Sequence, residues 1–148
     1  MIFYIATRLE RAEEQKELSA ALIALGHEIS YDWSVHGSVQ SEGPERIREV
    51  AIAETRGVMD AELFVCLLPG GRGTHSELGI AIADSVHRQM QRRAGIIGGQ
   101  KKIVIVGDDV TDGRTCSFYH HECISERFHT DEHFIAFMRG IGAGGGWR

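Results

Sequence analysis

The sequence is poor in three features that mark whole classes of protein. It holds only three cysteines among 148 residues. An odd number in a chain long enough to bury a core argues against a disulfide framework and predicts a reducing, cytoplasmic setting. Positive charge is also scarce, since 16 Lys and Arg residues stand against 21 Asp and Glu residues, for a net charge of −5. That balance argues against binding to a nucleic acid polymer.

Long apolar runs are missing as well. No run approaches the length of a bilayer span, so we expect no membrane association. The first residues, MIFYIATRLE, lack the basic start of a signal peptide and read directly as a strand. There is no internal repeat and no linker. The sequence therefore predicts one globular domain over residues 1–140, followed by a flexible tail over residues 141–148.

Apolar runs that alternate with helix-like segments predict an α/β domain with a parallel sheet covered on both faces. Strands are expected at Ile2–Ala6, His27–Trp33, Leu63–Leu68 and Lys101–Gly107. Helices are expected at Leu9–Leu25, at Glu45–Asp60 with Pro44 in the first turn, at Thr74–Arg93 and at Asp131–Gly140. Ser34–Gly43 and Asp108–Thr115 read as loops, Gly95–Gln100 reads as a turn, and Ser117–Phe128 remains unassigned. Such sheets bind ligands beyond the carboxyl ends of their strands.

A glycine-rich segment lies at one of these strand ends. Three glycines, Gly70, Gly71 and Gly73, follow the strand Leu63–Leu68 and precede the helix at Thr74. Glycine permits unusual backbone torsions and a close approach of a ligand, and the start of a helix attracts anions such as phosphate. The alternative is a simple tight turn. No Lys-Ser or Lys-Thr pair follows, so this is not an ATP-binding loop.

Two carboxylates are candidates for chemistry. Glu77 follows the glycines, where it is either a capping-box partner of Thr74 or an ionised group aimed at the loop. An ionised carboxylate beside the anomeric carbon of a sugar can attack it or stabilise positive charge on it. Glu54 falls on the expected inward stripe of its helix, where a solvated charge does not belong. The other members of that stripe are Ile47, Val50, Ala51 and Val58. Glu54 either ends a polar patch or binds hydroxyl groups in a cleft.

Two further groups of residues were considered for ligand binding. Trp33 and His36 follow the second expected strand at the same sheet edge, and they are either loop packing or a stacking platform for a base. Cysteines and histidines also gather near the C-terminus, but their spacings match no standard zinc module. These residues are Cys116, His120, His121, Cys123, His129 and His133. We therefore expect no metal and no other cofactor.

Two stretches carry a resemblance to a known family. IFYIATR at the N-terminus and LFVCLLPGGRGTHSELGIAIA from Leu63 onward resemble the nucleoside 2-deoxyribosyltransferase family, which includes 2'-deoxynucleoside 5'-phosphate N-hydrolases. The similarity spans roughly Ile2 to Val106. PGGRGTHSE also resembles the PGGxGTxxE motif of the cytokinin-activating phosphoribohydrolases. The resemblance implies a flavodoxin-like, doubly wound fold of three α/β/α layers, and a homodimer or larger homo-oligomer.

The resemblance also implies roles for individual residues. Glu77 occupies the position of the glutamate that acts on C1', and Glu54 that of an acid, usually Asp, that binds the sugar hydroxyl. Thr7 and Arg8 end the first strand, where the family contacts base or phosphate. The transferases often carry Asp six residues before the catalytic glutamate, whereas this chain has Gly71. A glycine there suits a phosphate better than an aspartate does.

Together these observations predict an enzyme that cleaves the N-glycosidic bond of a nucleoside 5'-monophosphate, most readily a 2'-deoxy one. Glu77 is the expected nucleophile and Glu54 the ligand of the sugar hydroxyls. Gly70, Gly71, Gly73, Thr74 and Arg8 are expected near the phosphate, and Thr7, Trp33 and His36 elsewhere against the substrate. The donor of the proton that the base needs is either His36 or a residue from a second subunit. The alternatives are a base-exchanging nucleoside transferase and a nucleotide sensor without turnover.

Overall fold

The computed structural model describes residues 1–96, 99–108, 115–142 and 147. Its helices and strands follow in the order β1 (Ile2–Ala6), η1 (Leu9–Arg11), α1 (Ala12–Ala24), β2 (Glu28–Ile29), η2 (Trp33–Val35), α2 (Pro44–Asp60), β3 (Leu63–Leu67), α3 (Arg72–Arg93), β4 (Lys102–Val106), η3 (Ser117–His120), β5 (Ile124–Phe128) and α4 (Asp131–Gly142), where η marks a short 3-10 helix. Most of the expected loop Asp108–Thr115, two residues of the expected turn Gly95–Gln100 and most of the expected tail lie outside the described residues.

The five strands form one parallel sheet with the order β2-β1-β3-β4-β5. From β1 the chain crosses to β2 on one side, and from β3 it continues to β4 and β5 on the other. This is the order of flavodoxin-like folds, with a switch point between β1 and β3. The predicted α/β class and doubly wound topology are therefore confirmed.

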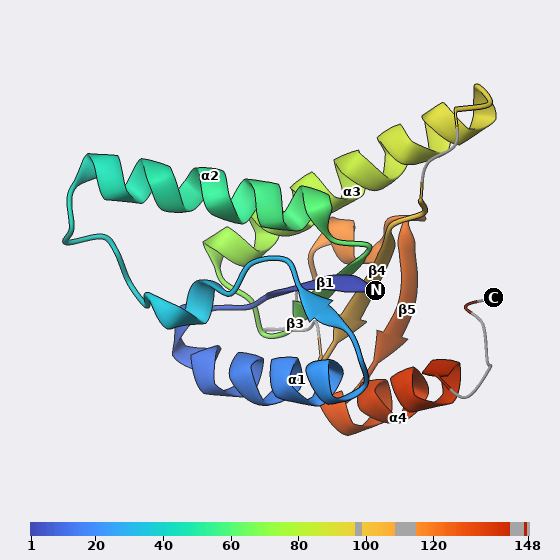
Figure 1. Cartoon of the computed structure of the whole chain (residues 1–148), viewed down its shortest axis with the longest axis horizontal. Helices are drawn as coiled ribbons and strands as arrows, with labels where there is room; N and C mark the ends of the chain where they lie inside the picture. Colours follow the sequence, from blue (N-terminus) through green and yellow to red (C-terminus); the bar gives the residue numbers. More distant parts are fainter. Residues whose placement is uncertain (97–98, 109–114, 143–146, 148) are drawn as a thin grey trace.

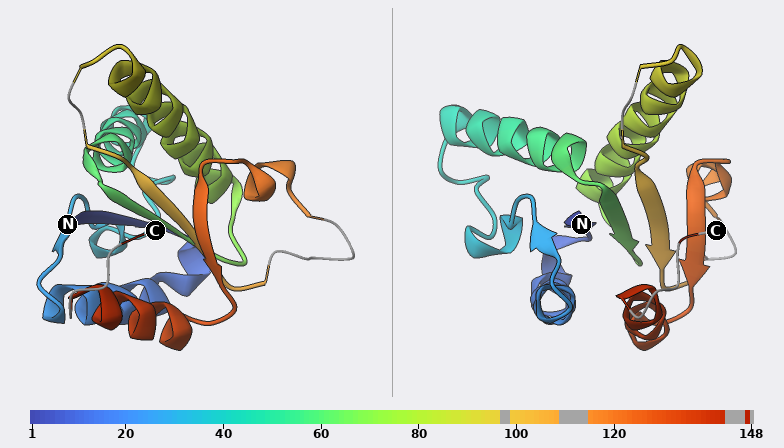
Figure 2. Two further views of the ribbon diagram at one scale, coloured as in Figure 1. Left: turned by 90° about the vertical axis from the view of Figure 1, so that its right-hand side faces the viewer. Right: turned by 45° about the vertical axis from the view of Figure 1, so that its right-hand side comes forward.

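Helices cover both faces of the sheet, with α2 and α3 on one side and α1 and α4 on the other (Figures 1 and 2). Alternate residues of each strand enter two separate cores, as the pleat of a strand requires. Tyr4 and Phe64 pack on the α2 and α3 side, whereas Phe3 and Val65 pack with α1 and α4. The three layers expected from the resemblance are thus present.

Several element boundaries differ from the sequence prediction. The expected strand His27–Trp33 is shortened to β2, because Asp32 caps a 3-10 turn by accepting hydrogen bonds from the Ser34 amide at 3.0 Å and its hydroxyl at 2.6 Å. The expected helix Leu9–Leu25 is divided into η1 and α1, and α3 begins at Arg72 rather than Thr74. The unassigned segment Ser117–Phe128 contains η3 and β5.

At the C-terminus, α4 continues to Gly142, two residues beyond the expected end. Trp147 packs against Phe137, with ring centroids 5.1 Å apart. No helix in the described part of the chain is both long and apolar enough to cross a bilayer.

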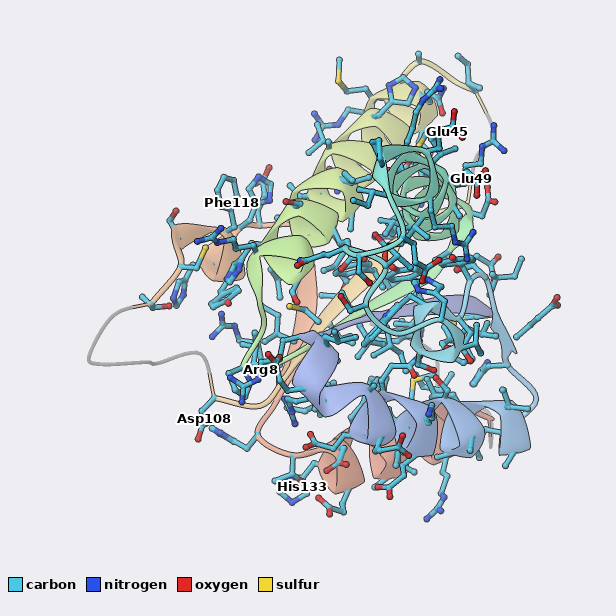
Figure 3. The ribbon with its side chains drawn as sticks, turned by 90° about the vertical axis from the view of Figure 1, so that its left-hand side faces the viewer. Arg8, Glu45, Glu49, Asp108, Phe118 and His133 are labelled. Carbon is cyan, nitrogen blue, oxygen red and sulfur yellow. The ribbon has the colours of Figure 1, made fainter. Side chains whose placement is uncertain are left out.

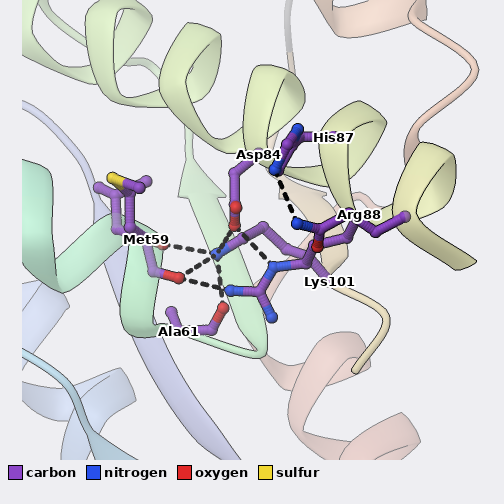
Figure 4. Close-up of polar contacts among 8 residues, drawn as sticks. Met59, Ala61, Asp84, His87, Arg88 and Lys101 are labelled. Carbon is purple, nitrogen blue, oxygen red and sulfur yellow. Dashed lines mark hydrogen bonds and ion pairs between the residues drawn. The ribbon is translucent and has the colours of Figure 1, made fainter. Parts of the chain in front are cut away.

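A fully buried lysine fixes α2 and α3 at the amino end of the sheet (Figure 4). The Lys101 ammonium donates to the carbonyls of Val58 and Ala61, both at 2.5 Å, and lies 3.1 Å from an Asp84 carboxylate oxygen. Arg88 also pairs with Asp84 and donates to the Met59 carbonyl at 2.6 Å. These cations bind the carbonyl groups that the end of α2 leaves without partners. The sequence prediction gave Lys101 no such role.

Candidate functional site

A cavity of about 490 Å³ opens at the carboxyl end of the sheet, beside the switch point between β1 and β3. Its wall combines the segments that follow β1, β2 and β3 with α2 and α3. The predicted site residues that line it are Thr7, Arg8, Trp33, His36, Glu54, Gly71, Gly73, Thr74 and Glu77. Residues from four separate stretches of the sequence therefore meet at the place where such folds bind ligands.

Glu77 forms the buried floor of this cavity. The carboxyl group belongs to a residue that is 8% exposed, and the Tyr4 hydroxyl donates a short hydrogen bond to its Oε1 atom. Burial raises the pKa of Glu77 to about 7, with a smaller increase from Glu54, while the bond from Tyr4 opposes the rise. Burial, followed by the charge of Glu77, also raises the pKa of Tyr4, so this tyrosine stays a donor.

The ring of Tyr4 is itself closely packed by Phe64 and by α2. Phe64 stacks on it, with ring centroids 6.0 Å apart and planes 5° apart. A Cβ atom added to Gly57 of α2 would lie 3.2 Å from the Tyr4 ring and 2.6 Å from the Cβ of Tyr31. Only a glycine at position 57 therefore lets α2 lie this close to the two tyrosines. The sequence analysis missed Tyr4. The available signal was a hydroxyl in an otherwise apolar strand, because such a group needs a buried partner.

The capping alternative for Glu77 is wrong. The helix α3 starts two residues earlier than expected, with Gly71 as the residue before its first turn. The Oγ1 atom of Thr74 accepts a hydrogen bond from the Gly71 amide at 2.9 Å and thereby closes the first turn. Glu77 lies in the second turn, directed at Tyr4 and the cavity. The carboxylate is therefore not used to cap the helix.

Glu54 lines the same cavity from α2 and is half-buried. Burial raises its pKa, and the positive charge that His36 can carry lowers it. The expected inward stripe on this helix is only partly confirmed, because Val50 and Val58 are buried whereas Ile47 is 42% exposed and Ala51 is also exposed. The N-terminal members of this stripe, Ile47, Val50 and Ala51, line the cavity together with Glu54.

The glycine loop works differently from the expectation. Left-handed torsions are found at other described glycines, whereas Gly71 is extended with φ −112° and neither Gly70 nor Gly73 has a positive φ. Gly70 is not among the cavity-lining residues. A Cβ atom at Gly70 would lie 2.7 Å from the Thr74 side chain, so its role is packing against the first turn of α3. Gly71 and Gly73 line the cavity.

The rim of the cavity near α3 favours an anion. An α-helix leaves its first amide groups without intrahelical partners, and the residues Arg72, Gly73 and Thr74 that supply them line the cavity. Arg8 is exposed at the same rim, and in Figure 3 it projects toward the end of the molecule that also carries Asp108. The buried hydroxyl of Thr7 has no hydrogen-bond partner in the described part of the chain.

Trp33 and His36 line the cavity from the segment after β2. Trp33 is 6% exposed, and its indole nitrogen donates to the Ile5 carbonyl at 2.8 Å, so its ring is fixed. The Nδ1 atom of His36 lies 2.9 Å from the Gly37 carbonyl, which requires a proton on Nδ1. The Nε2 atom has no partner among the described residues. Both residues line the cavity, and their role in binding a base stays a prediction.

A second histidine supports the glycine loop from outside the cavity. His75 contacts the Gly71 carbonyl through Nδ1 at 2.7 Å and the Tyr119 hydroxyl through Nε2 at 2.6 Å. This joins η3 to the loop before α3. Among the described residues, no group of three or more His, Cys, Asp or Glu side chains could hold a metal ion. The sequence analysis did not identify the role of His75.

A scan against protein-family models and a search of curated proteins both returned no match to this chain.

Proposed function

We propose that this protein cleaves the N-glycosidic bond of nucleoside 5'-monophosphates, most readily 2'-deoxy ones, with Glu77 as the nucleophile. The observation that carries the proposal is a buried carboxylate, held by Tyr4, at the floor of a cavity whose rim is the start of a helix. A nucleotide offers a matching layout, with an anomeric carbon between a phosphate and a base. The family resemblance of the glycine loop and the ELG segment supports the same assignment.

In the first step an oxygen of ionised Glu77 attacks C1' of the sugar. The C1'–N bond breaks, its electron pair goes to the nitrogen of the base, and the base takes up a proton. The candidate donors of that proton are a residue of a second subunit and His36, which lines the cavity and would give a proton from Nε2 of its imidazolium form, since Nδ1 donates to the Gly37 carbonyl. The product is a glycosyl ester of Glu77.

In the second step water attacks C1' of this ester, its proton is released, and the Glu77 carboxylate leaves with the electron pair of the C–O bond. The sugar phosphate then departs. Glu54 binds the sugar hydroxyls, and the amides of α3 with Arg8 bind the phosphate.

The ionisation of Glu77 sets the pH range of the reaction. The attacking group must be ionised, and burial raises the pKa of this carboxyl to about 7. Activity should therefore rise with pH through about 7. The bond from Tyr4 favours the ionised form and keeps the pKa from rising further.

The test is the release of free base from a panel of 2'-deoxynucleoside and nucleoside 5'-monophosphates and their nucleosides, followed by chromatography. Base release from monophosphates supports hydrolysis. Faster release on addition of a second free base, with a new nucleotide formed, indicates transfer. Tight binding without release from any member of the panel contradicts the enzymatic proposal and favours a sensor.

We also propose a homo-oligomer in a reducing, cytoplasmic compartment. The support is the family resemblance together with three cysteines, Cys66, Cys116 and Cys123, none of which forms a disulfide. Light scattering after size-exclusion chromatography measures the mass of the particle, and a value of 16.4 kDa for the whole chain would contradict the oligomer.

A further inference from the structure

The backbone of Gly71 is bound on both sides where it meets the rim of the cavity. Its amide donates to the Thr74 hydroxyl at 2.9 Å. Its carbonyl accepts from the backbone amide of His75 at 3.2 Å and lies 2.7 Å from the Nδ1 atom of the same residue. Nδ1 must carry a proton to donate to a carbonyl, so Nε2 of the neutral ring is an acceptor. The loop is therefore anchored by a side chain that is not among the cavity-lining residues.

Tyr119 of η3 supplies the partner of that acceptor. Its hydroxyl lies 2.6 Å from Nε2 of His75, and the two rings stack with centroids 5.6 Å apart. His75 is exposed, whereas Tyr119 is buried at 5% exposure. The backbone of Tyr119 is bound in turn, because its carbonyl accepts from the Arg127 side chain of β5. The buried tyrosine therefore fixes a histidine ring that would otherwise keep its rotamer freedom in solvent.

The orientation of the Gly71 carbonyl determines that of the next amide. A trans peptide group is planar, so its N–H points opposite to its C=O. With the Gly71 carbonyl bound by His75, the Arg72 amide is fixed pointing outward from the first turn of α3. Arg72 lines the cavity, and the Gly71 amide is already used by Thr74. The Arg72 amide is therefore the first that α3 can offer to a ligand.

We propose that His75 and Tyr119 are positioning residues for the phosphate of the substrate, and that η3 thereby takes part in selecting a monophosphate over a nucleoside. The inference rests on the proposed function, which places the phosphate at the start of α3. Neither residue lines the cavity, so both act through the Gly71 peptide. Tyr119 also lies beyond Val106, where the family resemblance ends, so the resemblance assigns it no role.

The experiment measures kcat/KM for a 2'-deoxynucleoside 5'-monophosphate and for the matching nucleoside. His75→Ala should lower the value for the monophosphate by about tenfold, which corresponds to one charge-assisted hydrogen bond to phosphate. The value for the nucleoside should stay within about twofold of the wild-type value, because a nucleoside has no phosphate for the Arg72 amide to bind. A merely structural role of His75 would lower both values together.

Two further variants test the contact between the rings and its place in the fold. Tyr119→Phe keeps the ring and removes only the hydroxyl, so it should lower the monophosphate value by about threefold in the wild-type background. It should cause no further loss in His75→Ala, since the tyrosine acts through the histidine. His87 is another exposed histidine of α3, and its ring pairs with Gln91. His87→Ala is the matched control and should change neither value.

Four outcomes overturn the inference while base release persists. They are equal kcat/KM for both substrates in the wild type, an equal loss for both in His75→Ala, an unchanged monophosphate preference in that variant, and additive losses in the double variant. If no substrate releases its base, the proposed function fails instead. The Kd values of the two ligands, measured by titration calorimetry, then decide the inference. A monophosphate preference that falls in His75→Ala supports it, whereas an unchanged preference, equal Kd values or no binding by the wild type refutes it.

Discussion

Two buried charged groups lie at opposite ends of the same sheet, and their surroundings differ. At the amino end, Lys101 is bound by backbone carbonyls of α2 and by Asp84. At the carboxyl end, Glu77 has Tyr4 as its bonded partner and faces a cavity. Lys101 has its donors used by the protein, whereas Glu77 keeps an oxygen available. The comparison indicates that a buried charge with all partners in place stabilises the fold, while one left partly unpaired beside a cavity is available for chemistry.

The largest expected effect is on catalysis at the carboxyl end. Glu77→Gln should lower kcat/KM for base release by about a thousandfold or more, because an amide cannot replace a carboxylate nucleophile. Steady-state kinetics on the best substrate of the panel gives this value. Glu49→Gln, which changes an exposed carboxylate on α2, is the control and should remain active. A Glu77→Gln protein with nearly wild-type kinetics would remove Glu77 from the mechanism.

The same substitution should stabilise the fold at high pH. The pKa of Glu77 is raised from 4.5 to about 7 in the folded protein. The neutral Glu77 carboxyl therefore stabilises the folded wild-type protein by roughly 3 kcal/mol below about pH 4.5. This contribution to the free energy of unfolding is lost as the pH rises through about 7. The free energy of unfolding of Glu77→Gln should not fall over this pH range, because the amide does not ionise. Urea unfolding at pH 5 and pH 8 measures the difference, and parallel pH profiles for the two proteins would contradict it.

At the amino end, the expected effect is on stability. Lys101→Met should lower the free energy of unfolding by about 3 kcal/mol, because it leaves Asp84 and the carbonyls of α2 without their cation. Urea unfolding measures this. Lys102→Met changes the next residue, which is half-buried, and should cost less than about 1 kcal/mol. The folded Lys101→Met protein should keep its kcat/KM within about twofold of the wild-type value. A large loss of kcat/KM in that folded protein would contradict the assignment of stability to the amino end of the sheet and of catalysis to the carboxyl end.

The glycine loop should determine the preference for phosphate. Two charge-assisted hydrogen bonds to a phosphate favour a monophosphate over its nucleoside by about a hundredfold in kcat/KM. Gly71→Asp should abolish or reverse this preference by placing a negative charge at the rim. A Cβ atom at Gly71 lies 3.2 Å from the Arg8 Cβ, so Gly71→Ala controls for that contact. Equal kcat/KM for nucleoside and monophosphate in the wild type would instead favour a nucleoside transferase.

The smallest expected effect concerns Tyr4 as a positioning residue. Its bond lowers the pKa of Glu77 against the larger effect of burial. Tyr4→Phe should therefore move the midpoint of the rise in kcat/KM above about 7 and reduce activity at pH 7 by about tenfold. The profile of kcat/KM against pH measures the midpoint. Lys101→Met should leave it in place, and an unchanged midpoint in Tyr4→Phe would mean that the tyrosine only packs.

The sequence was sufficient for the order of elements because each strand of the sheet centre is an apolar run. Leu63–Leu68 and Lys101–Gly107 were predicted almost to their ends for that reason. β2 was overestimated, because the Asp32 side chain forms a local cap that residue alternation does not reveal. The segment Ser117–Phe128 could not be assigned from the sequence, because β5 is an edge strand with exposed residues and therefore lacks an apolar run.

The candidate site was predictable where a motif marks it and not where packing creates it. Glu77, Gly71 and Gly73 lie in one short segment and line the cavity together with Glu54. The bond from Tyr4 to Glu77 joins residues 73 positions apart, and although a hydroxyl in an apolar strand indicates that Tyr4 needs a partner, no sequence pattern identifies Glu77 as that partner. Lys101 was seen as the start of a strand, because its contacts depend on where α2 ends.

Cys66, in the middle of β3, is fully buried, and burial raises the pKa of its thiol to about 12, with Glu77 and Cys116 adding to the rise. The thiolate is the form that attacks thiol reagents, so this buried sulfur stays unreactive for as long as the sheet is closed. The rate at which Cys66 is labelled in native buffer therefore measures how often the central strands open. The chain thus carries its own reporter of sheet opening, with which substitutions at either end of the sheet can be compared without denaturant.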